Sequence, residues 1–406
     1  MATGKALNGK PYAGNQHVAP SQRYGGTSRF DEGEVASAAT PRRGSLLYDR
    51  RKFLSTCAAS AVAFGAPNIL RAQSKKRKFI WANLIQLGCN MWNDHDIDPE
   101  KPYSNRVADY LRFDEKVWRN LTEQSRDVGM NMIVIDLAEG LVYPSHPELA
   151  VKGSWTPEKL RKELARLRHM GLEPIPKMNF SATHDVWLKE YARMVSTETY
   201  HRVIADLVKD VCEIFDKPRF LHIGMDEEGA TLQAAFRYAV TRNEDVWFDD
   251  LKRIVAAVER QGVRAWMWSD PAWNYPDFMT NVPKGVVQSN WYYWKDVKEV
   301  EAKLADPKFS TGTKRPDWAG QNHPAELKAF MDLQGAGFDQ IPCATTWNSD
   351  ENMDLVVDYC IRKLDSSRLL GFFLTDWTCT WNEEAALKKH AEFFPLVKKI
   401  IEKYDA

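Results

Sequence analysis

Three consecutive carboxylates, Asp226, Glu227 and Glu228, directly follow an apolar segment that begins at Phe220. Crowding and partial burial at the end of a strand would raise the proton affinity of at least one of them. A carboxyl group of this kind suits general acid chemistry. Cleavage of a glycosidic bond needs such a proton donor, together with negative charge or a nucleophile at the anomeric carbon. The alternative is a solvated helix start, where the helix dipole favours acidic residues.

Eight short apolar runs alternate with longer amphipathic segments from Lys78 onward. Such alternation predicts parallel strands covered by helices, and eight units ending in a helix favour one closed (β/α)8 TIM barrel over an open sheet. No Gly-x-Gly-x-x-Gly follows the first run, which weakens a dinucleotide-binding interpretation. The predicted strands are Phe79–Leu84, Met132–Asp136, Pro174–Met178, Phe220–Gly224, Ala265–Trp268, Val286–Asn290, Gln340–Thr345 and Gly371–Thr375.

The helix signals agree with this division. Thr156-Pro157 opens an amphipathic stretch that ends at Gly171, a second helix is predicted over 197–215, and the last over 383–404. Catalytic residues of such barrels lie where strands end and the following loops begin. The three carboxylates at 226–228 therefore fall on the face of the barrel where chemistry is expected.

The residues around the carboxylates resemble the His-x-Gly-x-Asp-Glu signature of glycoside hydrolase family 20, the β-N-acetylhexosaminidases. His222, Gly224, Asp226 and Glu227 carry the match. The resemblance implies catalysis assisted by the substrate, in which the 2-acetamido oxygen of the sugar attacks the anomeric carbon. Asp226 would orient that amide and stabilise its developing positive charge, and Glu227 would protonate the leaving group.

Further matches to the family occur at other strand ends. Thr183-His184 with Trp187 resembles its Pro-Gly-His loop, and tryptophans at several strand ends resemble those that form an aromatic box around one sugar. Flat indole faces pack well against sugar rings, although each tryptophan could equally be core. The two histidines have alternatives as well, a hydrogen-bonded core residue at 222 and a surface residue at 184. The candidate substrate-binding residues are His184, His222, Trp268, Trp291, Trp347 and Trp377.

Two departures from the family keep other functions open. The segment from Phe79 to Cys89 contains no counterpart of the sugar-binding arginine of the family, and Trp347 stands where its strand-seven motif has tyrosine. A retaining glycosidase of the two-carboxylate kind, acting on a non-acetylated sugar, would pair Glu227 with Asp350 or Glu351. A catalytically silent carbohydrate-binding barrel is the third possibility.

No metal and no cofactor are expected. The six cysteines form no Cys-x-x-Cys pair, which argues against structural zinc and a disulfide scaffold, so buried reduced thiols are predicted. The segment Asp94–Asp98 has alternating carboxylates that could approach a cation, but a solvated acidic loop is the preferred interpretation.

The N-terminal part has a different composition. Residues 1–47 are predicted to be a disordered leader, and residues 48–73 resemble a twin-arginine export signal through Arg50-Arg51 and the apolar stretch from Cys57 to Ala66. A chance basic pair before a buried helix is the alternative. We therefore expect the catalytic barrel to occupy residues 74–406, and expect a periplasmic or secreted bacterial protein that uses the twin-arginine translocation machinery.

Charge and hydropathy limit the remaining partners. Residues 73–406 hold 45 basic and 51 acidic residues, a net charge of −6, which gives no electrostatic reason to bind nucleic acid or an anionic membrane. The apolar stretch at 57–66 is too short for a stable membrane span. The resemblance to family 20 implies a carbohydrate substrate as the partner.

Overall fold

The computed structural model describes residues 79–311 and 322–405 of the 406-residue chain. The predicted leader and the twin-arginine segment lie outside these residues. Eight parallel strands form one sheet in the order β6-β5-β4-β3-β2-β1-β8-β7. The strands are β1 (Ile80–Gln86), β2 (Met132–Asp136), β3 (Glu173–Lys177), β4 (Phe220–His222), β5 (Arg264–Trp268), β6 (Val287–Ser289), β7 (Cys343–Thr345) and β8 (Gly371–Thr375).

The sheet closes between β6 and β7. Gln288 pairs with Gln340, and Trp291 with Cys343. The amide of Ile341 donates to the carbonyl of Gln288 at 2.9 Å, and that of Cys343 to Asn290 at 2.8 Å. These bonds join the two edges of the sheet, so the prediction of a single (β/α)8 barrel is confirmed.

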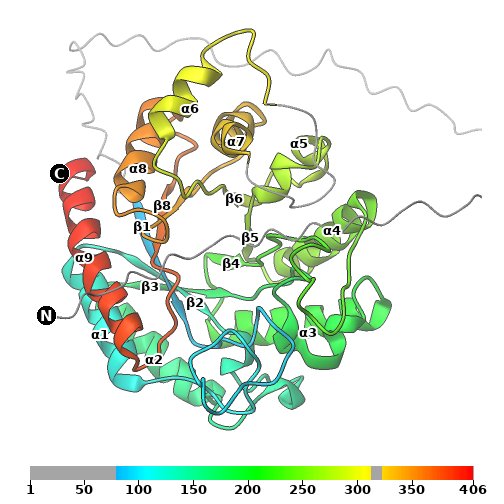
Figure 1. Cartoon of the computed structure of the whole chain (residues 1–406). Coiled ribbons are helices and arrows are strands. Elements are labelled where there is room, and N and C mark those ends of the chain that lie inside the picture. The colour runs from blue at the N-terminus through cyan, green and yellow to red at the C-terminus, as the bar shows by residue number, and fades with distance from the viewer. Residues whose placement is uncertain (1–78, 312–321, 406) are drawn as a thin grey trace, which may run out of the picture. The chain divides into compact units, whose positions relative to one another are not determined.

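Helices follow the strands and surround them (Figure 1). Thr156 accepts a hydrogen bond from the amide of Lys159 at the start of α2, and Thr197 accepts one from Tyr200 at the start of α3, which satisfies otherwise unpaired amides. The last helix, α9, packs against α1 and α8. The helices are α1 (Glu115–Asp127), α2 (Pro157–His169), α3 (Glu198–Ile214), α4 (Glu244–Arg260), α5 (Phe278–Asn281), α6 (Val297–Leu304), α7 (His323–Gly335), α8 (Asn352–Lys363) and α9 (Glu384–Tyr404).

Three predicted strands, which correspond to β4, β6 and β7, are shorter in the structure, and for β4 and β7 the reason is identifiable. β7 begins at Cys343 rather than at Gln340, because Pro342 has no amide hydrogen to donate to a strand ladder. β4 ends at His222 rather than at Gly224, because the chain turns there, with positive φ at Gly224 and Met225. The bounds of β2 and β8 are as predicted.

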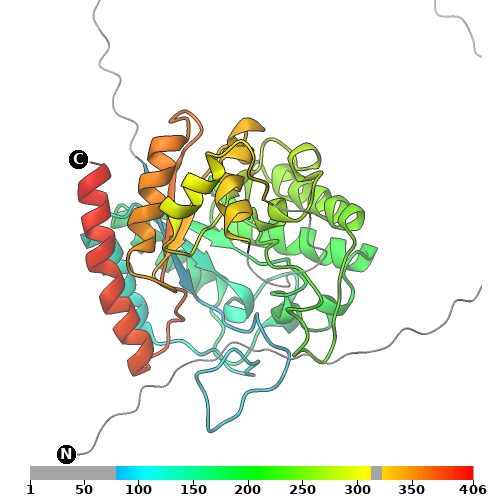
Figure 2. The same ribbon diagram turned by 45° about the horizontal axis from the view of Figure 1, so that its top comes forward.

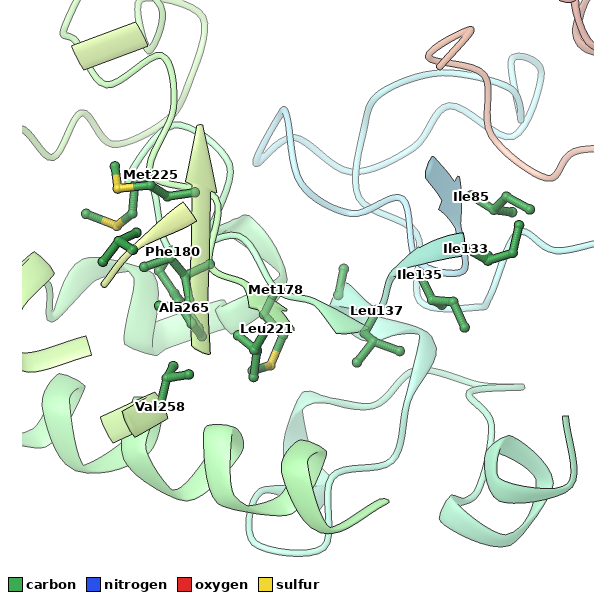
Figure 3. Packing of buried hydrophobic residues seen from close by; sticks show 14 of the residues in the cluster. Ile85, Ile133, Ile135, Leu137, Met178, Phe180, Leu221, Met225, Val258 and Ala265 are labelled. Carbon is green, nitrogen blue, oxygen red and sulfur yellow. The ribbon is translucent and has the colours of Figure 1, made fainter. Parts of the chain in front are cut away.

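Alternation along the strands produces two buried layers. Ala82, Val134 and Phe373 point into the barrel, whereas Ile133 and Leu221 face the surrounding helices. In Figure 3 the side chain of Val258, from α4, points toward the strands that carry Leu221 and Ala265. The buried layers hold the strand ends in fixed positions, from which the loops of the site begin.

The loop between β1 and α1 is long and is drawn in blue to cyan in Figure 2. The amide N–H of Arg237 is shared by the two carboxylate oxygens of Asp94, at 2.7 and 2.9 Å, and Asp96 forms an ion pair with the Arg237 side chain. These carboxylates therefore connect the loop after β1 to the loop after β4. The acidic segment Asp94–Asp98 thus holds two loops together.

The cysteines and helices bear on two further expectations. The five cysteines of the described residues are free and buried, as predicted. Within residues 79–311 and 322–405, no helix has the length and apolar character needed to cross a membrane.

Gly371 should be essential to the pairing of β8 with β1. A Cβ atom there would overlap the backbone nitrogen and oxygen of Ile80, its partner in the register. We expect Gly371→Ala to lower the free energy of unfolding by about 3 kcal/mol, because neither backbone can move away. Gly335→Ala, where a Cβ meets nothing within 4 Å, is the matched control and should be neutral or slightly stabilising. Urea unfolding, followed by tryptophan fluorescence, compares the two variants. Equal unfolding midpoints would show that Gly371 is not essential to the pairing of β8 with β1.

Candidate active site

Asp226, Glu227 and His184 meet at the carboxyl end of the barrel. His184 lies in the loop after β3, and its Nε2 atom is 3.4 Å from Oε2 of Glu227. Its Nδ1 atom is 3.9 Å from Oδ1 of Asp226. The side chains of His184 and Asp226 are 6% and 12% exposed, whereas that of Glu227 is 36% exposed. Glu227 is therefore the carboxylate of this group that a ligand can reach from solvent.

An unusual turn places these carboxylates. Gly224, Met225 and Glu227 all have positive φ, at 72°, 74° and 55°. A Cβ atom on Gly224 would overlap the side chain of Asn179, whose Nδ2 donates to Oδ1 of Asp226 at 2.8 Å. Left-handed conformations at non-glycine residues are unfavourable and persist where surrounding contacts hold them. Gly224, the glycine of the signature, thus allows Asn179 to come close enough to hold Asp226 by a hydrogen bond.

Asp270, directly after β5, supports the other carboxylate. Its Oδ2 atom accepts a hydrogen bond of 2.8 Å from the amide of Glu227, and Nε1 of Trp291 lies 3.3 Å from Oδ1. Burial and the charge of Asp226 raise the pKa of Asp270 well above its ordinary value. Sequence reasoning missed this residue, although an acidic side chain just beyond a predicted strand was an available signal.

The electrostatics of His184 follow from its neighbours. Burial alone would lower the pKa of His184, but the carboxylates of Asp226 and Glu227 outweigh it and raise that pKa to about 9. His184 therefore carries a proton at neutral pH, next to the exposed carboxylate. A buried imidazolium in this position can transfer a proton to Glu227 or hold it in place.

His222, the other predicted histidine, has a structural role. Its Nδ1 atom accepts a hydrogen bond of 3.1 Å from the amide of Gly224, so it supports the turn. Burial and the nearby Lys177 hold the pKa of His222 well below its ordinary value. The ring packs against Trp266 and Trp268 inside the barrel, with centroids 5.0 and 4.7 Å away. Of the two interpretations offered by the sequence, the core histidine agrees with these contacts.

A buried ion pair lies next to the site. Lys177, at the end of β3, binds Asp136, at the end of β2, and both side chains are 2% exposed. Burial raises the pKa of Asp136, and the ammonium of Lys177 opposes this rise only in part. Neither residue was predicted from the sequence, although both occupy strand ends that face the barrel interior.

The predicted tryptophans divide into a packed group and one exposed residue. Trp268 is 1% exposed and stacks on Phe373 at 5.1 Å, so it belongs to the barrel core. Trp377 donates from Nε1 to the hydroxyl of Tyr293 at 3.2 Å, and Tyr293 stacks on Trp291 at 4.6 Å. These rings form a continuous aromatic group between β5, β6 and β8.

Trp347 has a different environment. It is 57% exposed, and the ammonium of Lys389 lies 4.7 Å from the centre of its ring. Asp350 and Glu351, in the same loop after β7, are exposed as well.

His184, Asp226 and Glu227 also lie close enough together to share a metal ion. The geometry favours a proton over a metal, because the two carboxylates face different nitrogens of the His184 ring, Nδ1 at 3.9 Å and Nε2 at 3.4 Å. The absence of a metal remains a prediction.

A cavity of about 850 Å³ lies between the loops after β1, β2 and β3. Asn90, Tyr110, Glu139 and Trp187 are among its lining residues. Its lining includes neither Asp226 nor Glu227, so it is separate from the carboxylates, although it shares the loop that carries His184.

The fold and site define a (β/α)8 barrel with an acidic centre at the end of β4. No family model and no curated protein matches the chain. Solved structures share its fold. The β-N-acetylhexosaminidase from Bacteroides fragilis has 12% sequence identity and a TM-score of 0.52. The family 20 β-N-acetylhexosaminidase from Streptomyces coelicolor has 12% sequence identity and a TM-score of 0.51. A family 20 exo-β-N-acetylglucosaminidase from Vibrio harveyi, in complex with N-acetylglucosamine, has 10% sequence identity and a TM-score of 0.50.

Each match covers 79% of this chain, but only 65%, 64% and 54% of the respective structures. This chain thus spans less than two thirds of their length. At these identities the likeness concerns the fold, and at that level the predicted resemblance to family 20 is confirmed.

The protonated state of His184 predicts a pH dependence of stability. Because the pKa is about 9 in the folded chain and ordinarily 6.5, the contribution is fully present below pH 6.5 and is lost as the pH rises through 9. The difference corresponds to ~3 kcal/mol. Between about pH 6 and about pH 9.5, the free energy of unfolding of wild type should fall by this amount relative to that of His184→Gln, as measured by urea unfolding. A pH-independent gap between the two proteins would mean that His184 is not protonated in the folded state.

Proposed function

We propose that this chain is a glycoside hydrolase that releases a terminal sugar, N-acetylhexosamine, with Glu227 as general acid. The observation that carries the proposal is the contact of 3.4 Å between Oε2 of the partly exposed Glu227 and Nε2 of the buried His184, whose pKa the neighbouring carboxylates raise. A general acid needs access to the substrate and a partner that controls its proton. The fold shared with β-N-acetylhexosaminidases supports the same assignment.

Asp226 is assigned to the 2-acetamido group. Asn179 and His184 both approach Oδ1 of Asp226, so Oδ2 is the oxygen that would accept a hydrogen bond from the acetamido N–H. A carboxylate at this point also stabilises the positive charge that develops on the amide as its oxygen attacks the anomeric carbon. Asp226 is buried, and a fixed charge of low exposure acts strongly there.

The proton balance of the proposed reaction is simple. Glu227 takes a proton from His184 and donates it to the glycosidic oxygen as the bond to the anomeric carbon breaks and the acetamido oxygen forms its bond. The resulting Glu227 carboxylate then takes a proton from the water that attacks the anomeric carbon and displaces the acetamido oxygen. Glu227 then returns this proton to His184, so both groups end in their starting states, and the net reaction consumes one water.

The carboxylate pair of the competing mechanism has less support. It requires Asp350 or Glu351 as nucleophile, and both side chains are exposed in the loop after β7. The carboxylates that the structure gathers around Glu227 are Asp226 and Asp270. The silent binding barrel differs from the proposal in lacking turnover, so it is distinguished by assay.

Replacing the carboxylates should separate the mechanisms. With aryl N-acetylhexosaminides that have a poor leaving group, Glu227→Gln should lower kcat by about 100-fold or more, because the proton donor is lost. Asp226→Asn should lower kcat by a similar factor, and a thiazoline analogue of the cyclised acetamido intermediate should inhibit wild type.

Asp350→Asn and Glu351→Gln are the matched controls and should retain turnover. Loss of turnover in either control, with no effect of thiazoline and activity on glycosides without an acetamido group, would establish the two-carboxylate mechanism instead. Sugar binding in calorimetry with no release from any aryl glycoside would favour the silent barrel.

We also propose that the protein is exported by the twin-arginine route. The support is the order of Arg50-Arg51, Phe53-Leu54 and the weakly apolar segment up to Ala66. In a bacterial host, wild type should be recovered from the periplasm with a mature N-terminus near Ala72. Substituting both arginines with lysine should leave the protein in the cytoplasm, because the recognised pair is removed. Equal periplasmic recovery of both proteins would refute this proposal.

A further inference from the structure

The third carboxylate of the acidic run, Glu228, points away from Asp226 and Glu227. Its side chain is 4% exposed and forms an ion pair with Arg242, which is 2% exposed. Nε of Arg242 lies 3.1 and 3.2 Å from the two carboxylate oxygens. A buried pair of this kind adds little net stability, because desolvation offsets the attraction. Its role is therefore better explained by the backbone segments that the two side chains bind.

What it holds is the segment that leads to His184. Oε1 of Glu228 accepts a hydrogen bond of 2.8 Å from the amide of Ala182, two residues before the histidine. Nη2 of Arg242 donates to the carbonyl of Phe180 at 3.3 Å. The loop after β3 is thus bound to the loop after β4 at two points just before His184.

Arg242 is itself fixed to the helical layer. Its Nη1 atom donates to Oδ2 of Asp250, on α4, at 2.9 Å. The same oxygen accepts from the hydroxyl of Ser196 at 2.6 Å, and Oδ1 of Asp250 lies 3.1 Å from Nε2 of His201, on α3. Arg242 therefore cannot follow the loops if they shift, and acts as a fixed point for both.

We infer that Glu228 and Arg242 are positioning residues, which fix the distance between His184 and Glu227 and so control proton transfer in the reaction. The inference rests on the proposed function for its catalytic part. The contact between His184 and Glu227 joins two separate loops, and the strained turn at 224–227 needs external contacts to persist. A displacement of about 1 Å at such a contact can cost 100-fold in rate.

The test compares Glu228→Gln and Arg242→Lys with a control variant outside the site. The Glu228→Gln change keeps an acceptor for the amide of Ala182 but removes the charge, and Arg242→Lys keeps the charge but removes the forked contact. The control is Glu163→Gln, which breaks the pair of Glu163 with Arg166 on α2, where the side chains are 10% and 22% exposed. All three changes should leave a folded barrel, verified by circular dichroism and a cooperative melting transition.

Two readouts follow. In ¹⁵N NMR of the free protein, with the His184 signal assigned by its absence in His184→Gln, both site variants should move the pKa of His184 from about 9 toward 6.5. In kinetics they should lower kcat by about 10-fold to 100-fold, change KM by less than about 3-fold, and shift the pH profile. Glu163→Gln should lower only the melting temperature.

An unchanged His184 pKa in both site variants, with only a lower melting temperature as in the control, would overturn the inference. The NMR readout does not depend on hydrolysis. If wild type cleaves no glycoside but the site variants still move the His184 pKa, the proposed function fails while the positioning role stands. If wild type hydrolyses glycosides but the His184 pKa does not move in the site variants, the proposed function stands and the positioning role fails.

Discussion

A buried imidazolium between two carboxylates is stable only while all three groups keep their places. In this barrel His184 comes from one loop, and Asp226 and Glu227 come from the next. Neither loop is a regular element at that point, so side-chain contacts must fix both. Asn179 holds Asp226, and Asp270 holds the amide of Glu227. The charge of the histidine, and with it the proposed proton transfer, depends on these contacts.

The barrel provides the frame for this arrangement. Parallel strands in a closed ring bring the ends of β3, β4 and β5 to one face, so residues far apart in sequence become neighbours. The adjacent strands β2 and β3 add the buried pair of Asp136 and Lys177, and the charges of Asp226 and Lys177 act on the pKa values of their neighbours. The site is thus a set of coupled charges in which the protonation of one group depends on the others.

The acidic run at 226–228 shows how similar residues acquire different roles. Asp226 is buried against an amide donor, Glu227 is partly exposed beside a histidine, and Glu228 is buried against a guanidinium. Positive φ angles at Met225 and Glu227 turn successive side chains in different directions. Three consecutive carboxyl groups therefore occupy separate positions, and each can contribute to a different part of the site.

The sequence alone determined the number and order of the strands, the starts of α2, α3 and α9 and the placement of the acidic run at the end of β4, because hydrophobic periodicity and capping residues are local signals. It left the tryptophans ambiguous, and the structure buries Trp268 in the core while exposing Trp347. Only the tertiary structure brought Asp270 to the amide of Glu227 and Arg242 to Glu228. Such contacts join loops after different strands or distant positions of one loop, and their geometry arises from barrel closure and side-chain packing, which no local pattern encodes.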